Sequence, residues 1–233
     1  MKKKYFYILF LFLIFLARIL TTEESVKVMK NIFNNSEKPA AVTIVIDPGH
    51  GGRDPGKVGV NDALEKDINL KISLKLKNLL EQNDINVIMT REEDVGLYSE
   101  EDSNKKRADL NNRIQLINES DALFAVSIHQ NSFTQEYVKG AQVFYHAASS
   151  EGRELALILQ EEIKKTMDDG NRRKAKSNES YYMLKKTVCP LVIIECGYLS
   201  NLQEAELLVT EEYQEKMAWA ISLGILEYLN KSN

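Results

Sequence analysis

The sequence predicts a single α/β domain built on a mainly parallel sheet of about six strands, with helices on both faces. Strand-like runs alternate with helix-length stretches from residue 41 to about residue 230. The strand-like runs are almost continuously apolar, which is typical of parallel strands buried on both faces. The chain has 233 residues, enough for one domain with a sizeable hydrophobic core.

The first half of this domain is expected to contain two strands and two helices. Residues 42–46 (VTIVI) all favour strands, and residues 85–90 (INVIMT) form a second apolar run. Between them, residues 64–82 carry apolar side chains every three or four positions, the spacing of an amphipathic helix. A second helix is predicted at residues 108–120, with its N-terminal cap near Asp109.

The second half repeats the alternation. Short apolar runs predict strands at residues 122–129 (ALFAVSIH), 141–146 (AQVFYH) and 191–195 (LVIIE). Helical spacing of leucine and isoleucine predicts a helix at residues 150–167 and a closing helix at residues 211–229. The predicted domain therefore spans residues 41–230.

The residues before the domain predict export. Three lysines follow Met1, and residues 5–17 form an unbroken apolar run of 13 residues. That length fits a signal peptide better than a full membrane span, which needs about 20 residues. No small-residue cleavage site follows, so residues 1–20 are expected to be a signal peptide or an N-terminal membrane anchor. Residues 21–40 are polar and are expected to form a stalk. We expect the remainder outside the cytoplasm, associated with the membrane or the cell wall.

The charge and the cysteines exclude two classes. Four basic residues lie within the first 20, which leaves 26 basic against 34 acidic residues in the remainder. An acidic domain lacks the basic patches with which proteins bind nucleic acid. Cys189 and Cys196 flank a predicted strand, where seven residues span roughly 23 Å against a disulfide limit of ~7 Å. We therefore expect two free, mostly buried thiols.

Ionisable residues mark the ends of three predicted strands. His50 follows the first strand, His129 ends the third and Glu195 ends the last. Ligand sites in open α/β sheets gather at these carboxyl ends. Glu65 lies in the first turn of the helix at 64–82, near the middle of its apolar arc, and should point over the sheet. Burying it unpaired would cost several kcal/mol, so it needs a cation or hydrogen-bond partners.

Two histidines and a glutamate suit a catalytic zinc ion that keeps one position for water, whereas Mg²⁺ and Ca²⁺ prefer oxygen ligands. We expect one zinc ion on His50, Glu65 and His129, with Glu195 acting as general base and then general acid. Each residue also has a simpler explanation when it is taken alone. A strand-end histidine is commonly only hydrogen-bonded, Glu65 could interact with the helix dipole, and Glu195 could pair with a lysine. The combination favours a site.

Lesser candidates surround these four. Asp47 is expected to orient a nearby backbone segment or a histidine, or else simply to cap a turn. Asn131 and Arg172 are candidates for supporting the site or contacting substrate. Arg172 belongs to the basic stretch NRRKAK, which is either a solvated loop or an anion-binding rim for substrate carboxylates. His146 is expected at the surface or the rim of the site, without a role.

Together, four ordered motifs resemble the zinc-dependent N-acetylmuramoyl-L-alanine amidases of the cell-wall amidase 3 family. IVIDPGHGGRDPG contains His50, LEKDINL contains Glu65, SIHQNS contains His129, and CPLVIIECGYLSN contains Glu195. The resemblance runs from about residue 42 to 229. It implies hydrolysis of the amide that joins the lactyl group of N-acetylmuramic acid to L-alanine of the peptidoglycan stem peptide. The same zinc ligands and the same catalytic glutamate are implied.

Within that family, a leader without wall-binding repeats is similar to the sporulation amidases. Those enzymes strip peptides from cortex peptidoglycan so that muramic-δ-lactam can form for later germination. The resemblance implies a location in the forespore intermembrane space. Because no wall-targeting module is visible, we expect the domain to be localised by its N-terminal anchor or by an accessory protein, which could also activate it. Gln130, where alanine is common, and Cys196 depart from the family pattern without removing a required group. Two alternatives stay open: a zinc peptidase that cuts within the stem peptide, and a catalytically silent peptidoglycan-binding scaffold.

Overall fold

The structure is a computed structural model that describes residues 5–6, 9–10, 12–13 and 42–231. The predicted leader and stalk lie almost entirely outside the described residues. The chain divides into two units, Met1–Ala41 and Val42–Asn233, and the second unit holds the sheet. Within the described ranges, no helix combines the length and apolar character needed to cross a bilayer.

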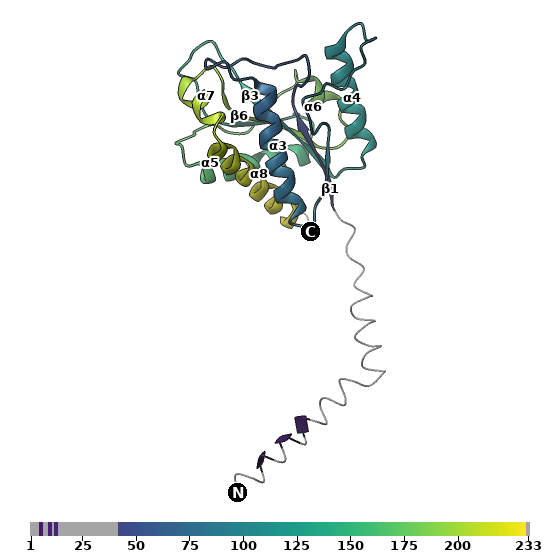
Figure 1. Cartoon of the computed structure of the whole chain (residues 1–233), viewed down its shortest axis with the longest axis vertical. Helices are drawn as coiled ribbons and strands as arrows, with labels where there is room; N and C mark the ends of the chain where they lie inside the picture. The colour runs from purple at the N-terminus through teal and green to yellow at the C-terminus, as the bar shows by residue number, and fades with distance from the viewer. Residues whose placement is uncertain (1–4, 7–8, 11, 14–41, 232–233) are drawn as a thin grey trace. The chain divides into compact units, whose positions relative to one another are not determined.

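The domain is built on one six-stranded sheet (Figure 1). Its strands are β1 (Thr43–Pro48), β2 (Asn86–Met89), β3 (Phe124–Asn131), β4 (Gln142–Tyr145), β5 (Lys176–Ser177) and β6 (Leu191–Tyr198). Their order is β2-β1-β3-β6-β4-β5, and every neighbouring pair is parallel except β4 with β6. The predicted fold class is confirmed. Only β5 was not expected, because two exposed residues leave no apolar run to detect.

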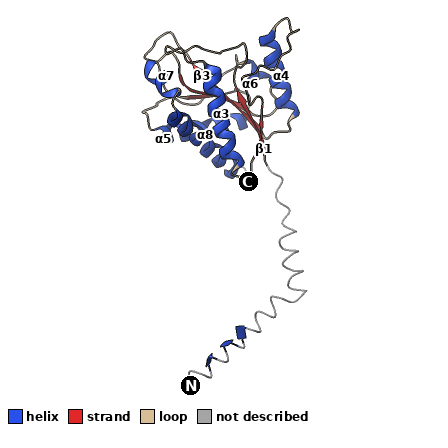
Figure 2. Ribbon diagram, in the orientation of Figure 1, coloured by secondary structure: helices blue, strands red, loops and turns tan. Residues whose placement is uncertain are grey.

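Helices cover both faces of the sheet (Figure 2). The bounds are α3 (Glu65–Glu81), α4 (Lys105–Glu119), α5 (Ser150–Met167), α6 (Tyr182–Lys186), α7 (Leu202–Leu208) and α8 (Glu211–Lys231). Apolar residues of α3, α5 and α8 pack with Ile44 and Val126, whereas those of α4 and α6 pack with Val45 and Ala125. Successive strand residues thus point to opposite faces, and both faces are buried.

The start of α4 differs from the prediction. The helix begins three residues early, because the side chain of Asn104 caps it by accepting a hydrogen bond from the Arg107 backbone N–H. Asp109, the expected cap, lies inside the helix. It accepts hydrogen bonds from the backbone of Leu97 and from Arg113. The two predicted free thiols are confirmed, Cys196 being fully buried and Cys189 partly.

Candidate metal and catalytic site

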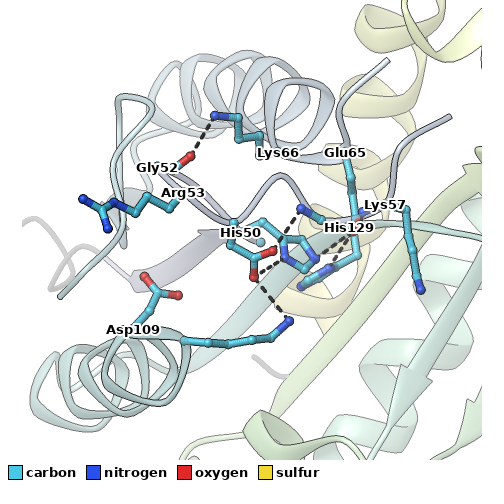
Figure 3. A network of polar contacts seen from close by, with 12 residues as sticks. His50, Gly52, Arg53, Lys57, Glu65, Lys66, Asp109 and His129 are labelled. Carbon is cyan, nitrogen blue, oxygen red and sulfur yellow. Dashed lines mark hydrogen bonds and ion pairs between the residues drawn. The ribbon is translucent and has the colours of Figure 1, made fainter. Parts of the chain in front are cut away.

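Three of the predicted site residues come together at the carboxyl edge of the sheet. His50 lies in the loop after β1, Glu65 is the first residue of α3, and His129 lies near the end of β3. Oε1 of Glu65 is 3.2 Å from Nε2 of His50 and 2.9 Å from Nδ1 of His129. Figure 3 shows the two imidazole rings and the carboxylate pointing toward one another. The potential ligand atoms all lie within 4.8 Å of one another, so this group could hold a metal ion.

The loop that presents His50 is held by buried arginines. His50 has a φ of 61°, and Gly51 and Gly52 after it also have positive φ, so the chain turns in a conformation that side chains disfavour. Arg113 Nη2 donates to the His50 carbonyl at 2.6 Å. Arg91 donates from Nη2 to the Gly49 carbonyl at 3.1 Å. These bonds hold the loop against its unfavourable backbone geometry.

The donor set fits zinc. A tetrahedral zinc ion with ligands at about 2.0–2.1 Å separates its ligand atoms by roughly 3.3 Å, close to the spacings around Glu65 Oε1. The second oxygen of Glu65 accepts a hydrogen bond from the Lys57 backbone N–H at 2.7 Å, which fixes the carboxylate. Nδ1 of His50 is 3.0 Å from Asp54 Oδ2, so its Nε2 turns toward Glu65.

Asp54 was not among the predicted site residues. A carboxylate bonded to the far nitrogen of a histidine ligand sets its tautomer and ring orientation. The sequence did contain a signal that could have identified Asp54, because this acidic residue lies four positions after His50 within the same glycine-rich motif.

Electrostatics at this cluster favour positive charge. Burial opposes protonation of His50, but hydrogen bonds to Asp54 and Glu65 outweigh it and raise the pKa of His50 to about 9. Burial would raise the pKa of Glu65, yet the bonds to both histidines hold that pKa well below its usual range. The carboxylate is therefore ionised, and the cluster stabilises either a proton or a metal cation. A cation must displace that proton, so metal affinity should rise with pH.

Glu195 lies directly opposite His129 in the pairing of β6 with β3. One oxygen, Oε1, accepts a hydrogen bond from the Tyr181 hydroxyl at 3.3 Å. The other oxygen, Oε2, is buried without a hydrogen-bond partner in the described part of the chain. Burial raises the pKa of Glu195, opposed by the nearby imidazole of His129. A carboxylate with one unpartnered oxygen beside the three potential metal ligands suits proton transfer.

A cleft of about 180 Å³ opens over Glu195 and His129. Its other walls come mainly from the segment around α6, with Tyr181, Tyr182 and Met183, and each of α4 and β6 adds one residue, Leu110 and Ile193. Such a cleft can hold part of a ligand next to Glu195 and the potential metal ligand His129.

Asp47 supports the site indirectly. It is fully buried and accepts hydrogen bonds from Ser127 Oγ, Thr90 Oγ1 and Arg113 Nη1 at 2.6, 2.6 and 2.7 Å. Burial alone would raise the pKa of Asp47, but Arg113 and the two hydroxyls lower it to about 2. These partners include no histidine, so Asp47 acts on the His50 loop through Arg113 rather than by orienting an imidazole. Asp47 contacts no histidine because its side chain points toward α4, where it meets Arg113.

Arg113 was missed, although it had a sequence signal. It lies between Leu110 and Ile117 on the apolar stripe of its helix, four residues after Asp109. A charged residue on a buried stripe needs partners, and the side chain is only 1% exposed.

The remaining candidates share no described hydrogen bond with the three potential metal ligands. The Asn131 side chain accepts a hydrogen bond from the Ser132 backbone N–H. Arg172 is exposed and lines a separate cavity of about 690 Å³ beside α7. None of the three potential ligands lines that cavity. His146, expected at the surface or the rim of the site, is half-buried and lines a third cavity, which none of the three potential ligands lines.

The chain is similar to a known protein family and to several curated proteins. The family model described as N-acetylmuramoyl-L-alanine amidase matches residues 44–227. The chain is 38% identical over 206 residues to the germination-specific N-acetylmuramoyl-L-alanine amidase of Bacillus subtilis. The aligned region covers 85% of this chain and 86% of that protein. Over 250 residues it is 25% identical to the N-acetylmuramoyl-L-alanine amidase AmiA of Escherichia coli, covering 84% and 81%.

Solved structures give the same result. The CwlD amidase from Clostridioides difficile, in complex with the GerS lipoprotein, superposes with a TM-score of 0.79 and 46% identity over 81% of this chain and 98% of that one. An N-acetylmuramoyl-L-alanine amidase from Clostridium difficile 630 follows with a TM-score of 0.73 and 32% identity, covering 83% and 99%.

Proposed function

The chain belongs to the amidase 3 family of N-acetylmuramoyl-L-alanine amidases that act on peptidoglycan, and we propose that its activity depends on one zinc ion held by His50, Glu65 and His129. The observation that carries the proposal is the convergence of three ligand atoms around Glu65 Oε1, beside a buried carboxylate on the neighbouring strand. The donor set of two imidazoles and one carboxylate is the one expected for catalytic zinc.

Glu195 is the proposed acid–base group. When bound, zinc supplies an electrophilic centre that polarises the amide carbonyl and makes a nearby water more acidic. Glu195 takes the proton from the attacking water with its unpartnered Oε2. As the carbon–nitrogen bond breaks, Glu195 returns that proton to the amine of L-alanine. The products are a lactyl carboxylate on the sugar and a free stem peptide.

Substrate contacts beyond the reacting amide are assigned to exposed or edge residues. We propose that Arg172, exposed on the loop before β5, meets a carboxylate of the stem peptide. Replacing it with alanine should then raise the KM for peptidoglycan and leave kcat unchanged. Asn131 accepts a backbone hydrogen bond from Leu199 and is proposed to keep the ends of β3 and β6 together behind the site. Asn131→Ala keeps that carbonyl and removes only the side-chain bond from the Ser132 backbone N–H, so stability should fall by about 1 kcal/mol while zinc affinity stays unchanged.

The biological setting is proposed to be modification of spore-cortex peptidoglycan. The support is the 38% identity to a germination-specific amidase and the 46% identity to the CwlD amidase. Stem-peptide removal would then precede formation of muramic-δ-lactam, which later germination requires. Muropeptide analysis of spores from a deletion strain should show loss of the lactam, and a normal lactam content would exclude this role.

Export and an accessory protein complete the proposal. The N-terminal run of apolar residues supports export with or without cleavage, into a compartment where peptidoglycan is accessible, such as the space between forespore membranes. The C. difficile CwlD amidase was solved in complex with a lipoprotein, and we propose an accessory protein for this chain as well. Co-purification from sporulating cells should recover it, and recovery of the amidase alone would argue against a stable complex.

Mass spectrometry of digested peptidoglycan tests the chemistry. Residues 25–233 would be incubated with purified peptidoglycan, with added zinc or with a chelator. Free stem peptides beginning with L-alanine, absent after chelation and absent with Glu195→Ala, are the expected result. Products cut inside the stem would instead assign a zinc peptidase. Absence of products under both conditions would favour a scaffold or an enzyme that needs its partner.

A further inference from the structure

Among the residues that the structure describes, Tyr181 is the one whose side chain donates a hydrogen bond to Glu195. Its hydroxyl reaches Oε1 at 3.3 Å from the residue that immediately precedes α6. Tyr181 is half-buried, and its ring lines the cleft over Glu195 together with His129. The contact joins a loop side chain to the proposed general base, so its effect on that base can be derived.

The backbone of this loop is fixed by β4. The Asn178 backbone N–H donates to the Tyr145 carbonyl at 2.8 Å, next to the short β4–β5 pairing. Asn178 Oδ1 in turn accepts hydrogen bonds from the backbone N–H groups of Ser180 and Tyr181 at 2.7 and 2.9 Å. An Asx-type turn of this kind sets the position from which the tyrosine side chain leaves.

The ring of Tyr181 is also fixed by packing. Its edge meets the ring of Phe144, with centroids 5.5 Å apart and planes at 73°. Phe144 lies on β4, next to Ile193 on β6, two residues before Glu195. The tyrosine hydroxyl is therefore located by the sheet rather than by a free loop.

The two oxygens of Glu195 have different surroundings. Oε1 accepts from Tyr181, whereas Oε2 has no partner within the described residues. The terminal torsion of a glutamate is broad when no hydrogen bond restrains it. With Oε1 held, the carboxylate plane is set, and Oε2 remains free for the proton of the attacking water.

We propose that Tyr181 is a positioning residue for the amidase reaction, which holds Oε1 of Glu195 so that Oε2 accepts the proton. The inference rests on the proposed role of Glu195. Tyr181 acts through Glu195 and not on the substrate. The step that it assists is proton transfer, so kcat should depend on the hydroxyl while the KM and zinc affinity should not.

The variant Tyr181→Phe removes only the hydroxyl and keeps the ring against Phe144. Tyr181 donates a hydrogen bond to a charged group, and loss of such a bond in the transition state should lower kcat about tenfold. The expected result is that fall in stem-peptide release, with KM within about twofold and with zinc affinity unchanged, since no other described bond uses the hydroxyl.

Tyr213→Phe is the matched control. Its hydroxyl donates to the carbonyl of Cys196 at 3.0 Å, one residue from Glu195 along β6, and the ring packs in the core shared with α8. Losing that bond should lower stability and leave kcat unchanged. Comparing Tyr181→Phe with Tyr213→Phe therefore distinguishes two effects. One is the general effect of losing a tyrosine hydroxyl near β6, and the other is the specific effect of losing the hydroxyl that contacts Glu195.

Unchanged kcat in Tyr181→Phe would overturn the inference, as would a change confined to KM, which would assign the hydroxyl to substrate binding. An equal loss of zinc affinity would assign it to the metal site and overturn it too. Wild type and Glu195→Ala are measured in the same assay, and together they show whether the proposed function or only the Tyr181 inference fails. If wild type releases no stem peptide, or Glu195→Ala remains active, the proposed function fails. If both behave as expected and only Tyr181→Phe matches wild type, this inference alone fails.

Discussion

Replacing Arg113 with methionine should both destabilise the protein and weaken the metal site. The guanidinium is 1% exposed and its partner Asp47 is completely buried, at 2.7 Å between Nη1 and Oδ1. Removing one partner of a buried ion pair costs about 3–5 kcal/mol, because the other charge remains without compensation. At the same time the His50 carbonyl loses its donor, and the Pro48 carbonyl keeps only the bond from Arg91 Nε.

The same change should reduce zinc affinity. Arg113 holds the carbonyl of His50, whose backbone has an unfavourable positive φ. Supporting groups of this kind change metal affinity by about 10–100-fold when they are removed. Arg113→Lys keeps the charge but cannot supply the same fork of donors, so we expect a smaller cost of about 2–3 kcal/mol.

Urea unfolding and zinc titration against a competing chelator measure the two effects. Arg107→Met, on an exposed position of the same helix, is the control and should lie within about 0.5 kcal/mol of wild type. Asp47→Asn combined with Arg113→Met completes a double-mutant cycle, with an expected coupling of about 2 kcal/mol. A cost below about 1 kcal/mol for Arg113→Met, or additive effects in the cycle, would refute this account of the ion pair.

Three further predictions concern the same edge of the sheet. Since the pKa of Asp47 is lowered to about 2 in the folded state, its stabilisation is present above about pH 4 and is lost as the pH falls toward 2. Wild type should therefore lose about 2 kcal/mol more than Asp47→Asn between pH 5 and pH 2 in urea unfolding, and equal losses would contradict the pairing. In Gly49→Ala, the new Cβ would lie 2.2 Å from the His129 ring, so zinc affinity should fall at least about tenfold, as a competition titration would show. Asp54→Ala removes the carboxylate that orients the other histidine and should lower zinc affinity by about 10–100-fold, whereas Asp94→Ala, which touches neither histidine, should not.

Much of the fold could be predicted from local pattern. Continuous apolar runs and helical spacing located five strands and four helices, because burial on both faces of a parallel sheet leaves a signal in each short segment. The missed elements β5, α6 and α7 are too short for a period to appear. The error at the start of α4 arose because Asn104, a single side chain, decides where that helix begins.

The candidate metal ligands and the candidate base were accessible for a related reason. His50 follows a predicted apolar strand, and His129 and Glu195 end two others. Glu65 interrupts an apolar helical stripe, so each of the four breaks a local pattern that burial otherwise maintains. Their residue types alone restrict the chemistry to metal binding and proton transfer.

What only the tertiary structure decided is how these residues are supported. The sequence by itself determined the parallel sheet, the edge at which ionisable residues gather and the donor types. It could not pair Arg113 with Asp47, turn Tyr181 onto Glu195, or show that Arg172 lies at a separate cavity. Those contacts join segments distant in the chain, and they depend on strand order and loop paths. The periodicity of a segment predicts only whether a side chain is buried. Which residue it then contacts depends on how distant segments pack together.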